Sequence, residues 1–272
     1  MGDYFISVDE LRNRIGTTEA PVIFDVRRRE LFDMAPRILP TARWRQHTTF
    51  GEWAGGLPPS VSVVCYCTHG HNVSQLAVAA LRAGGIDART LAGGIEEWQE
   101  AGGPTILKAA LPGRDEDRAS RWVTRIRPKI DRIACPWLIR RFIDREAEFL
   151  FVEPAYVREV AGELGAIAYD VDGVELSHVG PNCTFDTLID RFGLADPALE
   201  YLRLVVRGAD TARLDLAPEA AGLLAVSLGI SAAAGSDDHS AVERGIDVYD
   251  ALYAWRRRAA TETHNWPAGR AA

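Results

Sequence analysis

Short apolar runs alternate with amphipathic segments along the amino-terminal part of the chain. The apolar runs predict buried strands at residues 21–27, 61–66 and 88–91. Apolar positions at helical spacing predict a helix at residues 73–83, and further helices are expected at residues 7–16 and after the glycine pair 93–94. Strands that alternate with helices indicate an α/β fold built on a parallel sheet, in which functional sites form at the carboxyl ends of the strands.

The carboxy-terminal part has a different pattern, dominated by helical periodicity. Helices are expected at residues 131–147, 156–164, 184–192, 197–207, 218–229 and 238–261, with Pro136 in the first turn of its helix. A strand is expected at 148–152, and residues 167–179 are interpreted as a β excursion that forms at most one small hairpin. Residues 106–120 mix proline, glycine and charge and are interpreted as a linker. The predicted organisation is therefore an α/β domain over residues 1–105, the linker, and a mostly α domain over residues 121–265.

Composition narrows the classes of protein. A chain of 272 residues that is 47% hydrophobic can form two ordinary domains. The net charge of −7 disfavours a general nucleic-acid binder. Four cysteines in no paired framework favour a reducing compartment, and the charged amino terminus lacks the apolar core of a signal peptide. The longest weakly polar run, Ala220–Gly235, is shorter than the roughly 20 residues that span a membrane. We therefore expect a cytoplasmic protein with no membrane partner.

Cys67 is the principal candidate for chemistry. It follows the predicted strand at 61–66 and precedes the predicted helix at 73–83, with only a short polar loop between them. Backbone N–H groups converge at the amino end of a helix and the helix dipole favours negative charge, so a thiolate there is favoured. The sequence thus predicts a nucleophilic sulfur, and the loop that surrounds it consists of Thr68, His69, Gly70, His71 and Asn72.

Two other interpretations of Cys67 remain open. A free cysteine is most often a small apolar core residue, although the polar loop argues against burial here. Cys65, Cys67, His69 and His71 alternate and are soft-metal ligands, but their spacing does not match paired zinc motifs. His69 and His71 either tune the thiol, hold an oxyanion as cations, or are solvated loop residues.

Charged residues elsewhere form three candidate groups. Asp25 and Arg27, at a strand end, are either surface residues or a structural pair that supports the neighbouring loop. Arg125, Arg127 and Lys129 crowd one segment and are candidate anion contacts by charge. A histidine and several carboxylates at element ends are candidate ligands of a transition metal, although a single Asp at a helix start is more often a cap. These residues are His178, Asp210, Asp237 and Asp238.

Residues 5–105 resemble the rhodanese, or sulfurtransferase, domain. The matching segments are Phe24-Asp25-Val26-Arg27, Leu39-Pro40-Thr41-Ala42, Val63–Cys67 with Gly70, and Leu91–Ile95 with Trp98. The resemblance implies that Cys67 carries a sulfane sulfur as a persulfide and passes it to an acceptor such as cyanide or a thiol, with no cofactor required. Asn72 and Val73 stand where many members carry an arginine and a small hydroxyl residue, which argues against thiosulfate as preferred donor and against a phosphatase.

Residues 121–258 are similar to the chromate-resistance ChrB carboxy-terminal domain. The similarity is carried by segments 122–153, 177–186, 206–211 and 249–255. It implies a link to bacterial chromate resistance, as a sensor or accessory of an exporter, with other chromate-resistance proteins as partners.

Together these features predict a sulfurtransferase coupled to a domain that handles an oxyanion or a metal. The expected small-molecule partners are a sulfur donor and acceptor, or chromate, which is a tetrahedral dianion. The alternative is a non-catalytic sensor or accessory protein that binds chromate or a metal.

Overall fold

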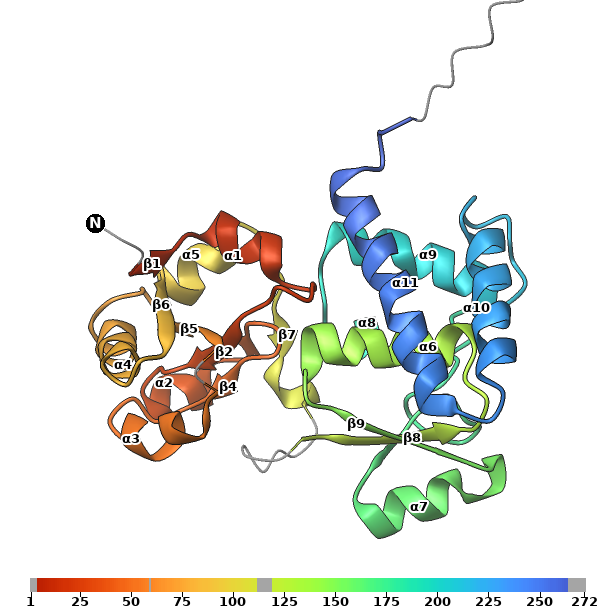
Figure 1. Cartoon of the computed structure of the whole chain (residues 1–272), viewed down its shortest axis with the longest axis horizontal. Helices are drawn as coiled ribbons and strands as arrows, with labels where there is room; N and C mark the ends of the chain where they lie inside the picture. Colours follow the sequence, from red (N-terminus) through yellow and green to blue (C-terminus); the bar gives the residue numbers. More distant parts are fainter. Residues whose placement is uncertain (1–3, 59, 112–118, 264–272) are drawn as a thin grey trace, which may run out of the picture.

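A five-stranded parallel sheet organises the amino-terminal unit (Figure 1). The structure is a computed structural model that describes residues 4–58, 60–111 and 119–263. The strand order is β1-β6-β5-β2-β4, and every neighbouring pair is parallel, as the sequence predicts. The strands are β1 (Phe5–Ile6), β2 (Val22–Asp25), β4 (Arg43–Trp44), β5 (Ser62–Tyr66) and β6 (Asp87–Leu91). The helices are α1 (Val8–Arg14), α2 (Arg29–Met34), α3 (Phe50–Trp53) with the 3-10 turn η1 (Ala54–Gly56), α4 (Asn72–Ala83) and α5 (Gly94–Glu100).

Strand β5 lies in the middle of this sheet and divides the core into two faces. Side chains alternate along a strand, so Val63 and Cys65 point to one face and Val64 and Tyr66 to the other. The first pair belongs to an apolar cluster with residues of α4. The second pair belongs to a larger cluster with residues of α1, α5 and the carboxy-terminal unit. Cys65 is thus a core residue, whereas Cys67 lies beyond the end of the strand.

Local capping explains where α1 begins. Ser7 has extended backbone geometry, and its hydroxyl accepts the N–H of Glu10 at 3.1 Å, as the spacing of the two residues predicts. Gly16 follows the helix with φ of +77°, a conformation that glycine adopts without strain.

The carboxy-terminal unit is mostly helical but contains a small parallel sheet. Strands β8 (Arg121–Arg125), β9 (Glu148–Val152) and β10 (Ile167–Ala168) pair in the order β10-β8-β9. The expectation of at most one small hairpin is therefore wrong, because β8 pairs with partners distant in sequence on both sides. The helical elements are α6 (Ile130–Leu138), the π-helical turn η3 (Ile139–Ile143), η4 (Pro154–Tyr156), α7 (Val157–Leu164), α8 (Thr184–Phe192), α9 (Pro197–Asp210), α10 (Ala220–Ala234) and α11 (Asp238–Arg258).

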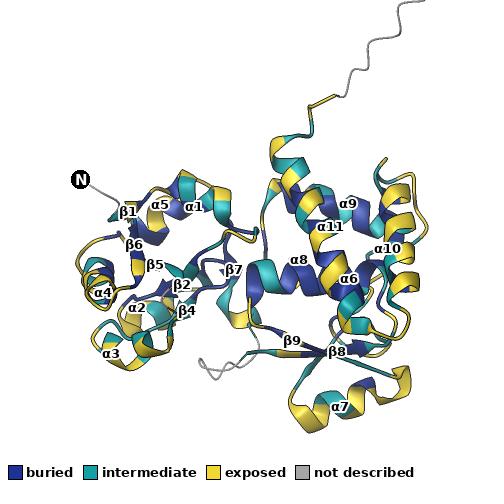
Figure 2. Ribbon diagram, viewed as in Figure 1, coloured by how far each residue is buried: buried dark blue, intermediate teal, exposed yellow. Residues whose placement is uncertain are grey.

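Helix α6 differs from its predicted form. It begins at Ile130, so Pro136 lies in its interior rather than in its first turn. Proline has no N–H to donate to the preceding turn, and the helix changes to the π-helical η3 three residues later. Every residue of α6 except Arg132 is buried, and Figure 2 shows α6 and α8 as the buried centre of this unit.

The segment predicted as a linker is partly ordered. Strand β7 (Ile106–Leu107) pairs antiparallel with β3 (Arg37–Ile38), and a 3-10 turn, η2 (Lys108–Ala110), follows. Residues 112–118 of the predicted linker lie outside the described residues. The described part of this segment therefore packs against both units: the amino-terminal unit provides the partner strand of β7, and Ser120 donates to Asp144 of the carboxy-terminal unit.

The two units share one continuous apolar core. The larger cluster includes Ile23 and Val64 from the first sheet as well as Trp137 and Phe142 from the second unit. The N–H of Thr41 donates to the carbonyl of Phe142 at 3.0 Å. Arg257, near the end of α11, donates to the Arg12 carbonyl at 2.7 Å, so it satisfies a carbonyl at the end of α1. These contacts make the junction a packed interface.

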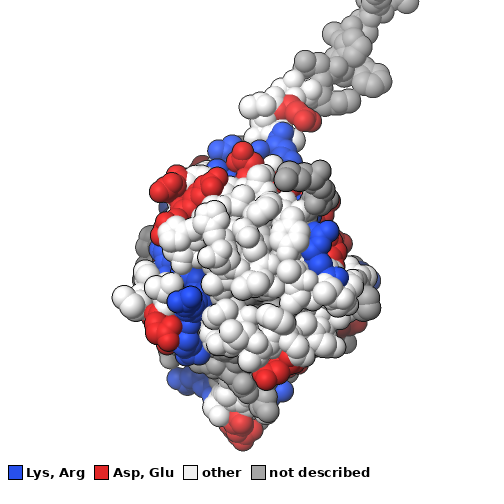
Figure 3. Space-filling view, turned by 90° about the vertical axis from the view of Figure 1, so that its left-hand side faces the viewer, with Lys and Arg blue, Asp and Glu red and all other residues white. Residues whose placement is uncertain are grey.

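The exterior adds two observations. Among the described helices, none is long and apolar enough to cross a bilayer. On the face formed by the amino-terminal unit, charged side chains lie mainly around the rim and the centre is uncharged (Figure 3). That face offers no broad basic surface for a nucleic-acid backbone.

Gly16 provides a test of the interface. A Cβ at this position would lie 2.5 Å from Cζ of Phe142 and 2.7 Å from Cε1 of Tyr253. We expect Gly16→Ala to lower the free energy of unfolding by roughly 2–5 kcal/mol, because backbone strain and overpacking add. Urea or thermal denaturation of the full chain measures the loss.

The matched control is Gly85→Ala. Gly85 has a similar φ of +82° but no atom within 4 Å of the added Cβ, so only the backbone strain of about 1–2 kcal/mol applies. Equal losses in the two variants would contradict a tightly packed junction.

Candidate functional site

Cys67 lies between the carboxyl end of β5 and the amino end of α4, as the sequence predicts. Its Sγ lies 3.3 Å from the carbonyl oxygen of His71, to which the thiol donates, and 3.3 Å from Oγ of Ser74. Ser74 is fully buried in the first turn of α4. The site thus brings a thiol and a hydroxyl into contact at the end of a twelve-residue helix.

The loop after Cys67 is held in place by α5. The N–H groups of Ile95 and Glu96 donate to the carbonyls of Cys67 and Thr68. A Cβ at Gly94 would lie 2.4 Å from each of these two carbonyl oxygens, so the close approach needs glycine. The Leu91–Ile95 segment, which carries part of the rhodanese resemblance, therefore has a physical role in positioning the loop.

Cys67 is more buried than the polar loop suggests. Its exposure is 8%, which corrects the expectation that the loop keeps it open to solvent. Burial raises the pKa of the Cys65 thiol on the preceding strand, so Cys65 is a poor nucleophile. A chelate of these two cysteines with His69 and His71 does not form, because Cys65 points into the core whereas the His69 side chain is 63% exposed.

The remaining loop residues have separate positions. Nε2 of His69 lies 3.1 Å from Oε2 of Glu96, and both side chains are exposed. His71 is the residue before α4 and contributes its carbonyl to Cys67. Gly70 has φ of +73° and its carbonyl accepts from Gln75, while Asn72 begins α4 with φ of +21°. Ser74 lies one residue after Val73, the position at which many rhodanese domains carry a small hydroxyl residue, and the fold brings its hydroxyl to the sulfur.

Asp25 and Arg27 form a buried pair beside this site. Both oxygens of Asp25 lie 3.0 Å from Nε of Arg27, and the hydroxyl of Tyr66, the residue before Cys67, donates to Asp25 at 2.8 Å. Burial acts to lower the pKa of Arg27, but the bond to Asp25 and the nearby negative charge raise it overall. The pair is therefore structural and supports the end of β5.

A second cluster of titratable groups lies in the carboxy-terminal unit. Nε2 of His178 is 3.5 Å from Oδ2 of Asp131, 3.5 Å from Oδ1 of Asp170 and 3.3 Å from Oδ2 of Asp210. The ligand atoms of Asp131, Asp170 and His178 all lie within 4.8 Å of one another. The side chains of Asp131 and Asp170 are 2% and 5% exposed, whereas His178 is 43% exposed. We refer to these four residues as the acidic cluster.

The carboxylates of the cluster are oriented by neighbouring donors. Asp131, in the first turn of α6, accepts the N–H groups of Thr184 and Phe185 at 2.7 and 2.9 Å. It therefore caps α8 across the fold, where the helix dipole favours negative charge. Asp170 accepts from Arg125 at 3.0 Å and from the Thr184 hydroxyl at 3.1 Å.

The cluster shifts the pKa values of its members. The contact with the carboxylate of Asp131 is the main cause that raises the pKa of His178 to about 9, against the effect of burial. Burial, followed by the charges of Asp131 and Asp170, raises the pKa of Asp210 to about 7. Burial and the charge of Asp131 also raise the pKa of Asp170.

Only two of the four predicted metal ligands belong to this cluster. His178 and Asp210 are members, whereas Asp237 caps α11 by accepting the Ser240 N–H and Asp238 accepts the Arg127 N–H at 2.8 Å. Asp237 and Asp238 thus lie outside the cluster, at the start of α11. Sequence alone places Asp131 at the start of a helix and gives no signal for Asp170, because only the tertiary fold brings strand and helix ends together.

The three candidate anion contacts have separate surroundings. Arg125 ends β8 and is paired with the buried Asp170, Arg127 is in a turn with φ of +56°, and Lys129 precedes α6. Arg125 therefore neutralises a carboxylate of the cluster, and anion binding by the three residues stays a prediction.

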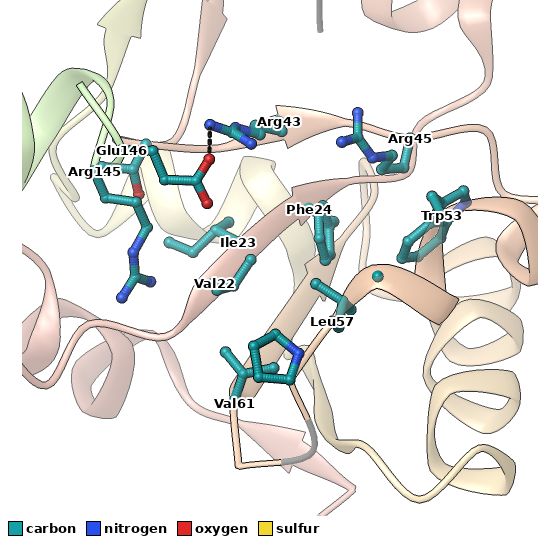
Figure 4. A pocket seen from close by; sticks show the side chains of 13 residues that line it. Val22, Ile23, Phe24, Arg43, Arg45, Trp53, Leu57, Val61, Arg145 and Glu146 are labelled. Atoms are coloured by element: carbon teal, nitrogen blue, oxygen red, sulfur yellow. Dashed lines mark hydrogen bonds and ion pairs between the residues drawn. The ribbon is translucent and has the colours of Figure 1, made fainter. Parts of the chain in front are cut away.

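A pocket of about 390 Å³ lies at the junction of the two units (Figure 4). Arg43, Arg45 and Arg145 surround it together with Trp53, and Arg43 is paired with Glu146 at 2.8 Å. The pocket lies along β2 and β4, and its lining includes neither Cys67 nor the loop that follows it. It is thus separate from the thiol site.

Comparison with known proteins identifies both units. Residues 7–101 match the family model for a rhodanese-like domain, so the amino-terminal unit is a rhodanese-like domain. Residues 122–256 match the model for the ChrB C-terminal domain, so the chain joins a rhodanese-like domain to a ChrB C-terminal domain.

Individual relatives cover parts of the chain. Protein ChrB of Cupriavidus metallidurans is 36% identical over 155 residues, which cover 56% of this chain and 46% of that protein. The chain thus spans about half the length of that relative. A rhodanese-related protein from Thermoplasma volcanium is 24% identical with a TM-score of 0.35, covering 39% of this chain and 100% of that one. A rhodanese-like domain protein from Staphylococcus aureus is 28% identical with a TM-score of 0.32, covering 35% and 91%.

The buried pair at the thiol site leads to a stability prediction. We expect Asp25→Asn to lower the free energy of unfolding by about 3–5 kcal/mol, because Arg27 would remain buried without its carboxylate. Urea denaturation measures the change.

Asp33→Asn is the control. Asp33 pairs with Arg29 one turn away on an exposed surface, where loss of the pair costs about 0.3–0.5 kcal/mol. A loss in Asp25→Asn no greater than in this control would refute the supporting role.

Proposed function

We propose that the rhodanese-like domain is a sulfurtransferase in which Cys67 carries a sulfane sulfur as a persulfide. The proposal is supported by one observation above all: Sγ of Cys67 lies at the end of β5, against the first turn of α4. The helix dipole stabilises negative charge at that point. The thiolate is the reactive form in sulfur transfer.

The proposed reaction has two displacements. First, the Cys67 thiolate attacks the outer sulfur of a donor, either thiosulfate or a persulfide of a small thiol; a new S–S bond forms and sulfite or the donor thiolate leaves. Second, an acceptor such as cyanide or a thiol attacks the outer sulfur of the Cys67 persulfide, and the Cys67 thiolate departs. No cofactor is required, since each step exchanges one bond to sulfur for another.

The neighbours of Sγ suit this cycle. The His71 carbonyl accepts the proton of the resting thiol, and the Ser74 hydroxyl can donate to the sulfur once that proton has left. The outer sulfur of a persulfide extends about 2.05 Å beyond Sγ. An outer sulfur on the exposed side of Sγ would be easier for an acceptor to reach than Sγ itself, since the Cys67 side chain is only 8% exposed.

The ChrB C-terminal domain connects this chemistry to chromate resistance in the proposal. The two domains share an apolar core, and Tyr66, which precedes Cys67, belongs to it. A change at either site can therefore be transmitted through packed side chains. The cellular location remains proposed as the cytoplasm, with small-molecule donors, acceptors or chromate, and other chromate-resistance proteins, as partners.

Cys67→Ser tests the proposal directly. The full chain, incubated with thiosulfate or with glutathione persulfide and then desalted, is expected to carry about one equivalent of cyanolysable sulfur and to release thiocyanate. The Cys67→Ser variant is expected to carry none, because the acceptor sulfur is gone. Cys65→Ala is the matched control, since Cys65 is buried in the core, and it should retain the sulfur. A wild-type chain that carries no sulfur from either donor would sink the sulfurtransferase proposal.

Ser74→Ala tests the contribution of the hydroxyl. Loss of a hydrogen bond to a charged group, worth about 1.5–3 kcal/mol, is expected to slow sulfur transfer roughly 10- to 100-fold. The rate of Cys67 alkylation by iodoacetamide at fixed pH should fall in the same direction, while circular dichroism stays native. An unchanged alkylation rate would show that Ser74 does not act on the sulfur.

A second function is favoured by a specific departure from the rhodanese pattern. Asn72 and Val73 replace the arginine and small hydroxyl residue of many members, and Cys67 is largely buried. Under this second function, the protein is a non-catalytic sensor or accessory of chromate resistance. It then takes up no sulfur but changes its stability on binding chromate or a metal.

A further inference from the structure

We propose that the acidic cluster of the ChrB C-terminal domain is a binding site for one divalent first-row transition metal ion, with Asp131, Asp170 and His178 as ligands and Asp210 beside them. The site is separate from Cys67 and does not depend on sulfur transfer.

The spacing of the donor atoms suits a metal better than a hydrogen bond. Nε2 of His178 lies 3.3–3.5 Å from oxygen atoms of three carboxylates. A charge-assisted hydrogen bond is about 2.7–2.9 Å long, and one N–H can satisfy only one such bond well. With metal–ligand distances near 2.1 Å, ligand atoms are separated by about 3.4 Å around a four-coordinate ion and by about 3.0 Å around a six-coordinate one.

The surroundings of the carboxylates are those of metal ligands. Oδ2 of Asp170 faces Arg125 and Arg132 at 3.0 and 3.2 Å, which leaves Oδ1 on the side of His178. Oδ2 of Asp131 is oriented by the Thr184 N–H at 2.7 Å. Hydrogen bonds of this kind orient the ligands of known metal sites.

Tyr169 supplies an independent observation. Its side chain is fully buried, and its hydroxyl oxygen has no hydrogen-bond partner within the described part of the chain. Tyr169 directly precedes Asp170 in the chain, and its hydroxyl pKa is raised by burial and by the charges of Cys135, Asp170 and Asp131, so it lies within electrostatic reach of the cluster. An unpaired buried hydroxyl costs about 1–3 kcal/mol, and a water molecule on a bound cation would provide its partner.

The net charge of the acidic cluster and its exposure to solvent both favour a cation as the ligand. The cluster holds three carboxylates, and Arg125 and Arg132 pair with one of them, Asp170. A metal ion that displaces the imidazole proton of His178 would therefore meet one net negative charge. His178 is 43% exposed and Asp210 is 18% exposed, so an ion can enter from solvent. Oxygen ligands with a single imidazole favour ions such as Mn²⁺, Fe²⁺ or Zn²⁺, whereas Ca²⁺ prefers six to eight oxygen ligands.

The experiment uses the full chain after treatment with a chelator. Isothermal titration with Mn²⁺ and with Zn²⁺, each alone, is expected to show about one equivalent bound by at least one of them. His178→Ala should weaken that binding at least tenfold, since it removes a ligand from a half-exposed position. His239→Ala is the histidine control: His239 is exposed at the start of α11, in contact with Phe151, and its loss should leave binding unchanged.

A carboxylate pair keeps the test decisive. Replacing Asp131 can unfold the domain, because this residue caps α8. The carboxylate variant is therefore Asp210→Asn, and its control is Asp237→Asn. We expect Asp210→Asn to weaken binding and Asp237→Asn, a helix cap outside the cluster, to leave it intact while circular dichroism shows both folded. The proposal is overturned if neither ion binds stoichiometrically, or if His178→Ala and Asp210→Asn bind as tightly as their controls.

Discussion

The apolar core that crosses the boundary between the two domains is the constraint on which this structure depends. Trp137 lies near its centre, with the rings of Phe142, Phe185, Tyr249 and Tyr253 at centroid separations of 5.6–6.3 Å. Gly16, at the end of α1, fits directly against two of these rings. Aromatic side chains bury large areas, so this cluster stabilises the domain junction as well as the second domain. The two functional sites therefore belong to one packed body.

Buried carboxylates have contrasting surroundings in the two domains. Asp25 is surrounded by the Arg27 guanidinium, its backbone N–H and the Tyr66 hydroxyl, so its charge is compensated locally. Both oxygens of Asp131 and of Asp170 also accept hydrogen bonds, but the oxygen of each that faces His178 lies 3.5 Å from its Nε2, beyond a good hydrogen bond. The first arrangement is that of a structural ion pair. The second is the basis of the proposed metal site.

The thiol site depends on backbone geometry more than on side-chain charge. The loop carbonyls of Cys67 and Thr68 are fixed by N–H groups of α5, and the glycine at position 94 permits this approach. The His69 side chain pairs with Glu96 on the surface instead of reaching the sulfur. The protein thus presents its sulfur with a hydroxyl and a helix end, without a nearby arginine in the loop.

Sequence alone determined the local elements and the order in which they occur. Periodicity and short-range hydrogen bonds act within a few residues of the chain. They account for the capping of α1 by Ser7, the helix at 184–192 and the position of Cys67 between strand and helix. The rhodanese-like and ChrB domains were identified from motifs because these segments are continuous in the chain.

Every relation between residues distant in the chain required the tertiary structure. Three such relations are the parallel pairing of β8 with β9 and β10, the contact of Ser74 with the sulfur, and the proximity of Asp131 to Asp170. A single acidic residue at a helix start has the same sequence signature whether it caps that helix, as Asp237 does, or reaches another, as Asp131 does. Only packing decides between them, because the free energy of a buried carboxylate depends on the donors that the fold brings to it.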